Sequence, residues 1–464
     1  MKIGFVVQRY GAEIIGGSEY HCRLIAEHLS RRPEHDIEVL TTCAREYTTW
    51  ENAYPEGTDR VRGVTVRRFA NAKTRDLDSF NEYSDWIFNN PHSRADEWNW
   101  LEQQGPWCPA LIDYLERQHA TYDALIFFTY LYAPTVLGLK VDPRRSILVP
   151  TAHDEPAIKL GIYQEVFSLP RGIAFNTTSE RGFLRQQFAI GAQVQEVVGC
   201  GVDLPPHLGP PQDPAESTQS AEDVDLQSDA EAAVAADEPD AGNGVSSVDN
   251  GRGAIFRRRH RLYDPFALYG GRIDAGKGCE ELIEYFSSYA DEQGDATLAL
   301  MGVKLMPIPE EPFIRFAGLL PEIERLEALE AATVVVVPSP YESLSLLALE
   351  AFAVGTPILA NARSDVLTAH CQRSNAGLYY GNREEFVECL KALMKDSALR
   401  AGMGLNGRAY VRDHYSWGVI LEKYERMMVK VTGRREGRGS RRGSRSRGPQ
   451  SGRSRKKAQG RRTS

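Results

Sequence analysis

The sequence contains two glutamates, Glu342 and Glu350, whose spacing and surroundings suit them to bind a ligand. The β-branched run Thr333–Val337 precedes them and predicts a strand buried on both faces. Gly355 and Pro357 follow them and predict that a helix ends there. The chain therefore runs from a strand, through a loop that carries Glu342, into a helix that carries Glu350. Open α/β sheets bind ligands at the carboxyl ends of their strands, and a helix N-terminus offers free N–H groups, so this order suits a diphosphate.

The helix is expected to begin at Ser343 or Ser345, either of which can cap it. Glu350 then lies about two turns along the helix among apolar side chains, where an ionised carboxylate is costly unless it is paired or hydrogen-bonded. A vicinal diol, such as a ribose, would satisfy both of its oxygens. A solvated Glu342 and a core Glu350 paired with a lysine or arginine fit the spacing equally well.

A second set of residues that could bind phosphate follows the strand predicted over residues 266–271. Arg272 comes directly after Gly271, and Lys277 follows five residues later, close to the expected N-terminus of a helix. Arginine offers a fork to phosphate oxygens and lysine offers a point charge. A solvated turn with two basic residues explains this stretch when it is taken alone. If it lies beside the start of the Glu350 helix, phosphate binding becomes the better interpretation.

Glycines and one histidine mark other predicted strand ends. Gly16 and Gly17 separate the first strand from a helix and would let a phosphate approach the backbone, although a tight turn before an ordinary helix is the simpler explanation. Gly318 follows a strand of the second half and could help line a flat base pocket, or serve as a plain turn glycine. His153 follows the strand 146–150 and could donate to a sugar hydroxyl or a phosphate, or tie its own loop together.

Strands and helices alternate through most of the chain, which predicts parallel, doubly wound α/β sheets. We expect a first domain over residues 1–203 and a second over 254–414, followed by a helix over 415–432 that crosses back to the first domain. Residues 75–105 of the first domain are polar and aromatic, and we expect an irregular excursion there.

Two segments differ from the rest in composition. Residues 204–253 are rich in Ala, Asp, Glu, Ser and Pro, and this acidic insert should be a disordered linker. Residues 433–464 carry 13 basic residues and one acidic residue, and we expect a disordered basic tail. Such a tail could touch RNA, anionic lipid or the acidic insert, but a solvated tail without a defined partner is the leading interpretation.

The composition indicates a cytoplasmic protein. The chain has 464 residues, a formal net charge of −8 and seven cysteines, an odd number without a C-x-x-C pair. This cysteine usage fits reduced thiols rather than a disulfide scaffold or a zinc site. The apolar run near the N-terminus is too short for a signal peptide, and no stretch is long enough to span a bilayer. Peripheral contact with an anionic surface at the inner face of a membrane remains compatible with this composition.

Taken together, these residues resemble the retaining glycosyltransferases of family four, the glycosyl transferases group 1. The resemblance covers residues 1–203 and 261–431. It rests on the Gly16-Gly17-Ser18-Glu19 turn, on Gly271-Arg272 with Lys277-Gly278, and on the Glu342 and Glu350 pair. It implies the GT-B fold, in which two Rossmann-like domains face a cleft, and transfer of a sugar from a nucleotide diphosphate donor to an acceptor hydroxyl with retention of configuration.

The resemblance also implies roles for single residues. Arg272 and Lys277 would hold the diphosphate and stabilise the leaving charge. Glu342 would hold sugar hydroxyls, Glu350 would hold the ribose, and His153 would stand near the sugar and the acceptor. The remaining donor contacts would come from Gly16, Gly17, Gly271, Gly318, Ser343, Leu344 and Ser345. The family requires no metal and no cofactor. The resemblance implies that the acceptor is a glycan or a lipid-linked glycan. A nucleic acid partner is not expected.

The sequence departs from the family pattern after the strand 357–360, where many relatives carry a glycine pair and this chain has Ala362-Arg363-Ser364. That change could narrow the sugar pocket. A catalytically silent nucleotide-sugar-binding protein and a GT-B nucleotide-sugar epimerase are the alternative functions. The intact cations argue against the first, and the lack of a further acid/base pair argues against the second.

Overall fold

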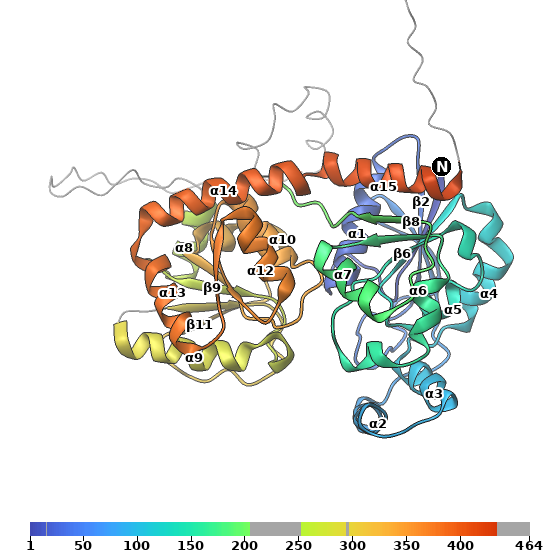
Figure 1. The fold of residues 1–464 in the computed structure, drawn as a ribbon, viewed down its shortest axis with the longest axis horizontal. Coiled ribbons are helices and arrows are strands. Elements are labelled where there is room, and N and C mark those ends of the chain that lie inside the picture. Colours follow the sequence, from blue (N-terminus) through green and yellow to red (C-terminus); the bar gives the residue numbers. More distant parts are fainter. Residues whose placement is uncertain (15, 205–251, 294–296, 434–464) are drawn as a thin grey trace, which may run out of the picture.

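The computed structural model describes residues 1–14, 16–204, 252–293 and 297–433, which form two α/β domains side by side (Figure 1). Most of the acidic insert and nearly all of the basic tail expected from the sequence lie outside the described residues. Arg252 and Gly253, which the sequence assigned to the insert, are the first residues of a helix of the second domain.

The first domain is built on an eight-stranded sheet with the order β3-β4-β2-β1-β5-β6-β7-β8, parallel except for β3 against β4. Its strands are β1 (Lys2–Val6), β2 (Asp36–Thr42), β3 (Gly57–Val61), β4 (Val64–Phe69), β5 (Ala124–Phe128), β6 (Ser146–Val149), β7 (Gly172–Phe175) and β8 (Val194–Val197). Its helices are α1 (Gly17–Ser30), α2 (Leu77–Asn89), α3 (Arg94–Gln104), α4 (Pro109–Gln118), α5 (Ala133–Gly138), α6 (Tyr163–Ser168) and α7 (Thr178–Gln187). Three 3-10 turns are η1 (His119–Thr121), η2 (Pro143–Arg145) and η3 (Pro156–Lys159).

The second domain has a fully parallel six-stranded sheet with the order β11-β10-β9-β12-β13-β14. Its strands are β9 (Ala267–Gly270), β10 (Leu298–Met301), β11 (Ile314–Gly318), β12 (Val334–Val337), β13 (Ile358–Asn361) and β14 (Gly377–Tyr380). Its helical elements are α8 (Arg252–His260), η4 (Ala275–Lys277), α9 (Cys279–Gln293), α10 (Glu322–Ala331), α11 (Leu346–Val354), α12 (Asp365–Ser374), α13 (Arg383–Lys395) and α14 (Ser397–Tyr415).

The last described helix, α15 (Trp417–Thr432), connects the second domain back to the first (Figure 1). It begins at Trp417, because Tyr415 is still the last residue of α14. The indole of Trp417 stacks on His28 of α1 at 3.6 Å and donates to Asp203. Buried apolar side chains form one continuous cluster from the first sheet through α15 to α10 and α11, so the two domains pack against each other.

The excursion expected over residues 75–105 is not irregular, because it contains the two helices α2 and α3. Asp76 caps α2, and Ser93 with Asp96 forms a capping box at the start of α3. Trp100 is buried and donates to Ser84 across the pair. The capping residues were visible in the sequence, but the aromatic content obscured the helical pattern.

Candidate active site at the strand ends

Lys277 and Glu342, predicted from separate motifs, meet in the structure. The amine of Lys277 donates to Oε1 of Glu342 at 2.7 Å. Asp274 caps η4 by accepting from the backbone of Lys277, and Gly278 continues the chain at φ +75°. A Cβ at Gly278 would lie 2.4 Å from the carbonyl oxygen of Pro338, so glycine allows η4 to pack against the end of β12. This close approach brings the lysine to the glutamate loop.

Arg272 lies at the same edge of the sheet and faces the first domain. Its side chain is about half exposed, pairs with Asp274 at 3.2 Å, and its guanidinium lies 5.9 Å from the ring of Tyr47 in the first domain. Burial opposes the charge, but Asp274 and Tyr47 outweigh it and raise the pKa of Arg272. The guanidinium therefore remains a fixed positive charge between the domains.

Glycines with positive φ stand at the ends of β9 and β11, and a Cβ at Gly318 would meet nothing within 4 Å. Gly271 has φ +144° and Gly318 has φ +81°, conformations that side chains rarely adopt. The amide of Gly302, which follows β10, donates to the carbonyl of Gly318 at 2.8 Å, and the amide of Gly271 donates to the carbonyl of Met301 at 3.0 Å, so the ends of β9, β10 and β11 are joined. The aromatic ring of Phe316 next to them is half exposed. An apolar ring is therefore exposed beside the open backbone of Gly318.

The start of α11 is held by a buried histidine. Nε2 of His370 lies 2.8 Å from the carbonyl oxygen of Leu344, and Nδ1 lies 3.1 Å from the hydroxyl of Tyr410. Burial lowers the pKa of His370 to about 4, so the ring is neutral near pH 7. Nε2–H then donates to Leu344 while Nδ1 accepts from Tyr410. His370 thereby fixes the loop between Glu342 and α11, and the sequence analysis missed it.

Ser345 is the N-cap of α11, but its side chain makes no capping hydrogen bond. Its backbone has φ +63° and ψ +80°, the left-handed region that favours glycine. Ser345 therefore occupies the N-cap position that the sequence predicted for Ser343 or Ser345, but its side chain does not cap the helix. A non-glycine residue kept in this conformation marks local strain, which often accompanies ligand sites.

Replacing Ser345 with Gly should raise the free energy of unfolding by up to about 1 kcal/mol, because the left-handed conformation no longer meets a Cβ. Urea denaturation measures the change. The matched control is Ser287→Gly in the middle of α9, where the same substitution should lower stability by roughly 0.5 kcal/mol. Equal losses in both variants would show that Ser345 carries no strain.

Glu350 is buried and bonded to a residue that the sequence analysis did not name. Nη2 of Arg325 on α10 donates to its Oε1 at 2.8 Å and to the hydroxyl of Tyr20 on α1 at 2.9 Å. Oε2 of Glu350 is buried without a hydrogen-bond partner among the described residues. Burial raises the pKa of Glu350, although Arg325 opposes this shift. Oε1 of Glu350 is therefore paired with an arginine, as the alternative interpretation of a core carboxylate expected. Oε2 has no hydrogen-bond partner among the described residues.

The glycine turn of the first domain places the start of α1 beside this site. Gly16 is the N-cap of α1, and a Cβ there would meet the carboxylate of Glu19 at 2.4 Å. A Cβ at Gly17 would meet nothing within 4 Å, so the backbone there is open to a ligand. Arg9 donates to Oε1 of Glu19 with two nitrogens, at 2.9 and 2.6 Å. The helix start and its N–H groups thus lie next to a neutralised ion pair.

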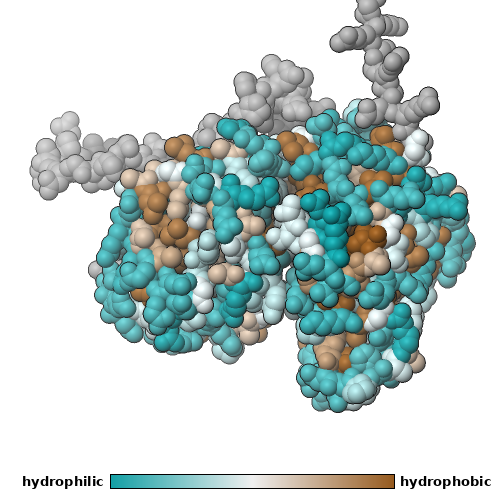
Figure 2. Space-filling view, in the orientation of Figure 1, coloured by the Kyte–Doolittle hydropathy of each residue, from teal (hydrophilic) through white to brown (hydrophobic). Residues whose placement is uncertain are grey.

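Two contacts cross from the first domain to the Glu342 loop. The ring of His153 stacks on Tyr341 with centroids 5.8 Å apart, and Nδ2 of Asn176 lies 3.4 Å from Oγ of Ser343. His153 also lies 3.7 Å from Glu155. The predicted histidine is therefore adjacent to the glutamate loop, as the strand-end argument required. Figure 2 shows a hollow between the two lobes, on the side opposite α15.

Glu180 on α7 holds the two loops that carry His153 and Asn176. Its Oε1 accepts from the amide of Ala152 at 2.7 Å, and its Oε2 accepts from the amide of Asn176 at 2.5 Å. The carboxylate thereby joins the loop that carries His153 to the loop that carries Asn176. Burial raises the pKa of Glu180 to about 8, although the two amides oppose this shift. Sequence reasoning missed it, although Thr177 three residues earlier forms a capping signal.

The elevated pKa of Glu180 predicts a pH dependence of stability. The unfolded pKa is about 4.3, so between that value and pH 8 the folded protein holds a proton that the unfolded chain has lost. The free energy of unfolding should therefore fall as pH rises through this window, by at most about 1.4 kcal/mol per pH unit from this group. Urea denaturation at pH 5.5 and 8 should show a smaller fall in Glu180→Gln than in the wild type. Equal falls would contradict the elevated pKa.

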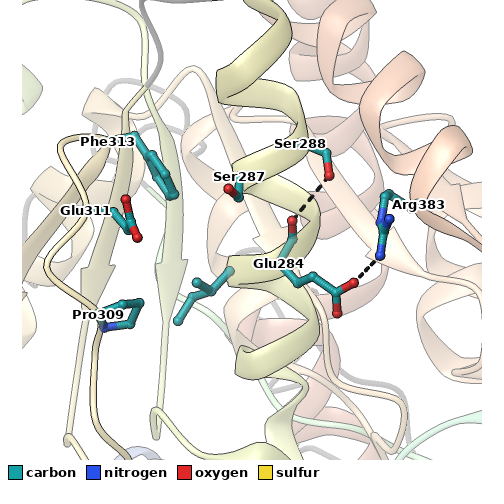
Figure 3. Close-up of a pocket in the computed structure, with 8 residues that line it drawn as sticks. Glu284, Ser287, Ser288, Pro309, Glu311, Phe313 and Arg383 are labelled. Carbon is teal, nitrogen blue, oxygen red and sulfur yellow. Dashed lines mark hydrogen bonds and ion pairs between the residues drawn. The ribbon is translucent and has the colours of Figure 1, made fainter.

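A second hollow lies on the outer side of the second domain and does not contain these residues (Figure 3). It has a volume of about 310 Å³ and lies between α9 and the loop before β11. It is lined by Ile283, Glu284, Ser287, Ser288, Pro309, Glu311, Phe313 and Arg383. Glu284 and Arg383 form an ion pair across it. A far smaller cavity of about 10 Å³ lies between the domains and is lined by Glu350, Arg325 and Tyr20 among others.

A group of three side chains that could share a metal ion, Glu34, His35 and Glu425, contains none of the predicted site residues. Two of its members precede β2 and the third is on α15. In the part of the chain that the structure describes, no helix is long and apolar enough to cross a membrane.

The family model and the relatives that match this chain are all glycosyltransferases. The family model for glycosyl transferases group 1 matches residues 264–396, which carry Arg272, Lys277, Glu342 and Glu350. A D-inositol 3-phosphate glycosyltransferase of Corynebacterium glutamicum is 26% identical over 66% of this chain and 72% of its own length. Another from Corynebacterium jeikeium is 32% identical, over 38% of this chain and 47% of its own length.

Solved structures share the architecture of both domains. Sucrose-phosphate synthase from Thermosynechococcus elongatus superposes with a TM-score of 0.62 at 17% identity, over 93% of this chain and 99% of that one. Anabaena Alr3699/HepE in complex with UDP and glucose superposes with a TM-score of 0.62 at 14% identity, over 93% and 100%. At such identities the likeness establishes the fold.

Two facing parallel-sheet domains with their site residues at the strand ends define a GT-B protein, so the fold class expected from the sequence is confirmed. The match to the glycosyl transferases group 1 lies in the second domain, over residues 264–396, and the chain is a glycosyltransferase.

Proposed function

We propose that this glycosyltransferase moves a sugar from a nucleotide diphosphate donor to an acceptor hydroxyl with retention of configuration. The observation that carries the proposal is the meeting of Lys277 and Glu342 at the start of α11, with Arg272 at the same sheet edge. Two cations and a helix N-terminus form a site for a diphosphate, and the carboxylate beside them can accept from sugar hydroxyls.

The donor would lie with its diphosphate between Arg272 and Lys277 and the open backbone at Gly17. Ser343, Leu344 and Ser345 would offer backbone N–H groups at the start of α11. The free Oε2 of Glu350 would accept from a ribose hydroxyl, and the half-exposed ring of Phe316 beside Gly318 would meet the base. Structures of HepE with UDP and glucose support a donor of this class.

In this proposal the cations of the chain, rather than a metal ion, offset the charge of the leaving diphosphate. His153, adjacent to Glu342 through Tyr341, would contact the sugar and the acceptor. The acceptor would be a glycan, free or lipid-linked, and a lipid-linked acceptor would require contact with a membrane surface.

A thermal-shift panel of UDP, GDP, ADP and TDP tests the donor class, and one nucleotide should raise the melting temperature in the presence of EDTA. Proton NMR of the product formed from the matching sugar donor then reports the anomeric configuration. Absence of any nucleotide shift, or a product of inverted configuration, would overturn the proposal.

A further inference from the structure

His370 on α12 is buried, and neither of its ring nitrogens is free to contact a substrate. Its Nε2–H donates to the carbonyl of Leu344 at 2.8 Å, and its Nδ1 accepts from the hydroxyl of Tyr410 at 3.1 Å. Leu344 lies between Glu342 and the strained N-cap Ser345, so the imidazole holds the turn from which the first N–H groups of α11 project. A shift of this ring would therefore move those N–H groups.

Aromatic rings join His370 to the end of α14. The rings of Tyr410 and Tyr415, both buried, have centroids 5.9 Å from the imidazole and meet it edge-on. The two tyrosine rings lie 5.5 Å from each other, and Tyr410 also packs edge-on against Phe352 of α11 at 6.2 Å. Rings in such contact attract one another and favour particular orientations. The start of α11 and the end of α14 are thus connected through His370.

Tyr415 also contacts the segments that connect the two domains. It is the last residue of α14, and from there the chain crosses through α15 to the first domain (Figure 1). Its carbonyl accepts from the amide of Val202, in the segment that follows β8, at 3.0 Å. Gly199 in that segment has φ +77°, and a Cβ there would lie 3.1 Å from the ring of Tyr415. Residues 199–202 and 415–417 therefore meet at this tyrosine and form the domain crossing.

A histidine of the first domain reaches the same crossing from α1. His21 is buried, and burial lowers its pKa to about 4, so near pH 7 its neutral ring donates from Nε2 to the carbonyl of Gly199 at 3.2 Å. The helix α1 begins at Gly17, where the backbone is open beside the proposed diphosphate site. Both helices whose N-termini flank that site are therefore connected to the domain crossing by a buried histidine.

We infer that His370 is a positioning residue for the diphosphate of the donor, and that it couples the start of α11 to the domain crossing. The inference rests on the proposed function, because it concerns the same diphosphate. A neutral imidazole has one donor and one acceptor, and here both are used, so a single side chain holds both ends of the connection. An apolar residue at this position would leave the carbonyl of Leu344 and the hydroxyl of Tyr410 without their buried partner, and the start of α11 would loosen.

Affinities for UDP and uridine, measured by NMR titration, separate positioning from folding, because only UDP carries the diphosphate. If the thermal-shift panel selects another base, its diphosphate and nucleoside replace this pair. His370→Leu, which removes both hydrogen bonds, should weaken UDP binding by about tenfold and leave uridine binding unchanged. His370→Gln, whose amide can donate to Leu344, should recover most of the UDP affinity.

Two milder variants test the connection even if His370→Leu does not fold. Tyr410→Phe removes only the hydroxyl from which Nδ1 accepts, and Tyr415→Leu alters only the domain crossing, so each should weaken UDP binding by about threefold. The matched control is Tyr424→Phe on α15, because the hydroxyl of this buried tyrosine has no hydrogen-bond partner among the described residues. Its UDP affinity should equal that of the wild type.

Equal losses of UDP and uridine binding in His370→Leu would show a histidine that only stabilises the fold, and would overturn the inference. Wild-type UDP affinity in Tyr410→Phe or in Tyr415→Leu would overturn it as well. Failure of the wild type to bind any nucleoside diphosphate would overturn the proposed function and the inference with it. Since the wild type reports on the proposed function and the variants report on the inference, the two failures are distinguishable.

Discussion

Lys277→Ala should lower the turnover of sugar transfer by about 10²–10³-fold, the loss seen when one group that stabilises developing charge is removed. In the structure, Lys277 is the cation bonded to Glu342 at the start of α11, so its loss would remove positive charge next to the leaving diphosphate. The side chain is about one-third exposed, so the pair should contribute less than about 1 kcal/mol to stability. Initial rates with the donor found by thermal shift, together with the melting temperature, measure both effects.

The matched control for this variant is Lys304→Ala, an exposed lysine of the same domain. It should keep wild-type turnover, which would show that the loss at Lys277 does not come from a change in net charge. Lys277→Arg should recover only part of the rate, because a guanidinium fork replaces a compact point charge. Wild-type turnover in Lys277→Ala would remove this residue from the diphosphate site.

Local patterns were enough to predict much of the fold and the proximity of Lys277 and Glu342 in the candidate site. The strand β12 reads as an apolar β-branched run, and Gly355 ends α11 in the left-handed conformation expected for a helix C-terminus. Lys277 and Glu342 each follow a strand of a parallel sheet, and neighbouring strands bring their carboxyl ends together. The short distance between the two side chains follows from this topology.

Contacts between distant segments could not be predicted in the same way. The buried Glu350 required a partner, but its sequence neighbours do not identify Arg325, which lies on the preceding helix α10. The stacking of His153 on Tyr341 depends on how the two domains pack, and no local periodicity encodes that packing. Ser345 shows a further limit, because the preference of serine for N-caps does not reveal a backbone at positive φ.

The ion pair between Arg325 and Glu350 also connects the proposed donor site to the contact between the domains. Arg325 donates to Tyr20 of α1, and the hydroxyl of Tyr20 donates to Glu322 at 3.0 Å. Arg62 of the first domain reaches the second oxygen of Glu322 at 3.1 Å. If a ribose binds Oε2 of Glu350 as proposed, the same carboxylate would contact the donor on one oxygen and, through Arg325, the first domain on the other.

Arg325→Met should lower the free energy of unfolding by about 3 kcal/mol at pH 8, because it leaves the carboxylate of Glu350 buried and unpaired. The loss should be smaller at acid pH. Burial raises the pKa of Glu350 and Arg325 opposes this shift, so removing Arg325 should raise the pKa further and let the carboxyl take up a proton more readily as the pH falls. The unfolded pKa is about 4.3, so the loss should grow as pH rises above that value, until the folded pKa is passed.

Urea denaturation of the wild type and the variant at pH 5.5 and pH 8 measures this dependence. The double variant Arg325→Met with Glu350→Leu is the informative control, because replacing both partners with apolar residues removes the unpaired charge and should restore most of the stability. An equal loss at both pH values would mean that the carboxylate does not become an unpaired buried charge when Arg325 is removed. In that case the coupling of Glu350 to the first domain through Tyr20 would have to come from packing rather than from charge.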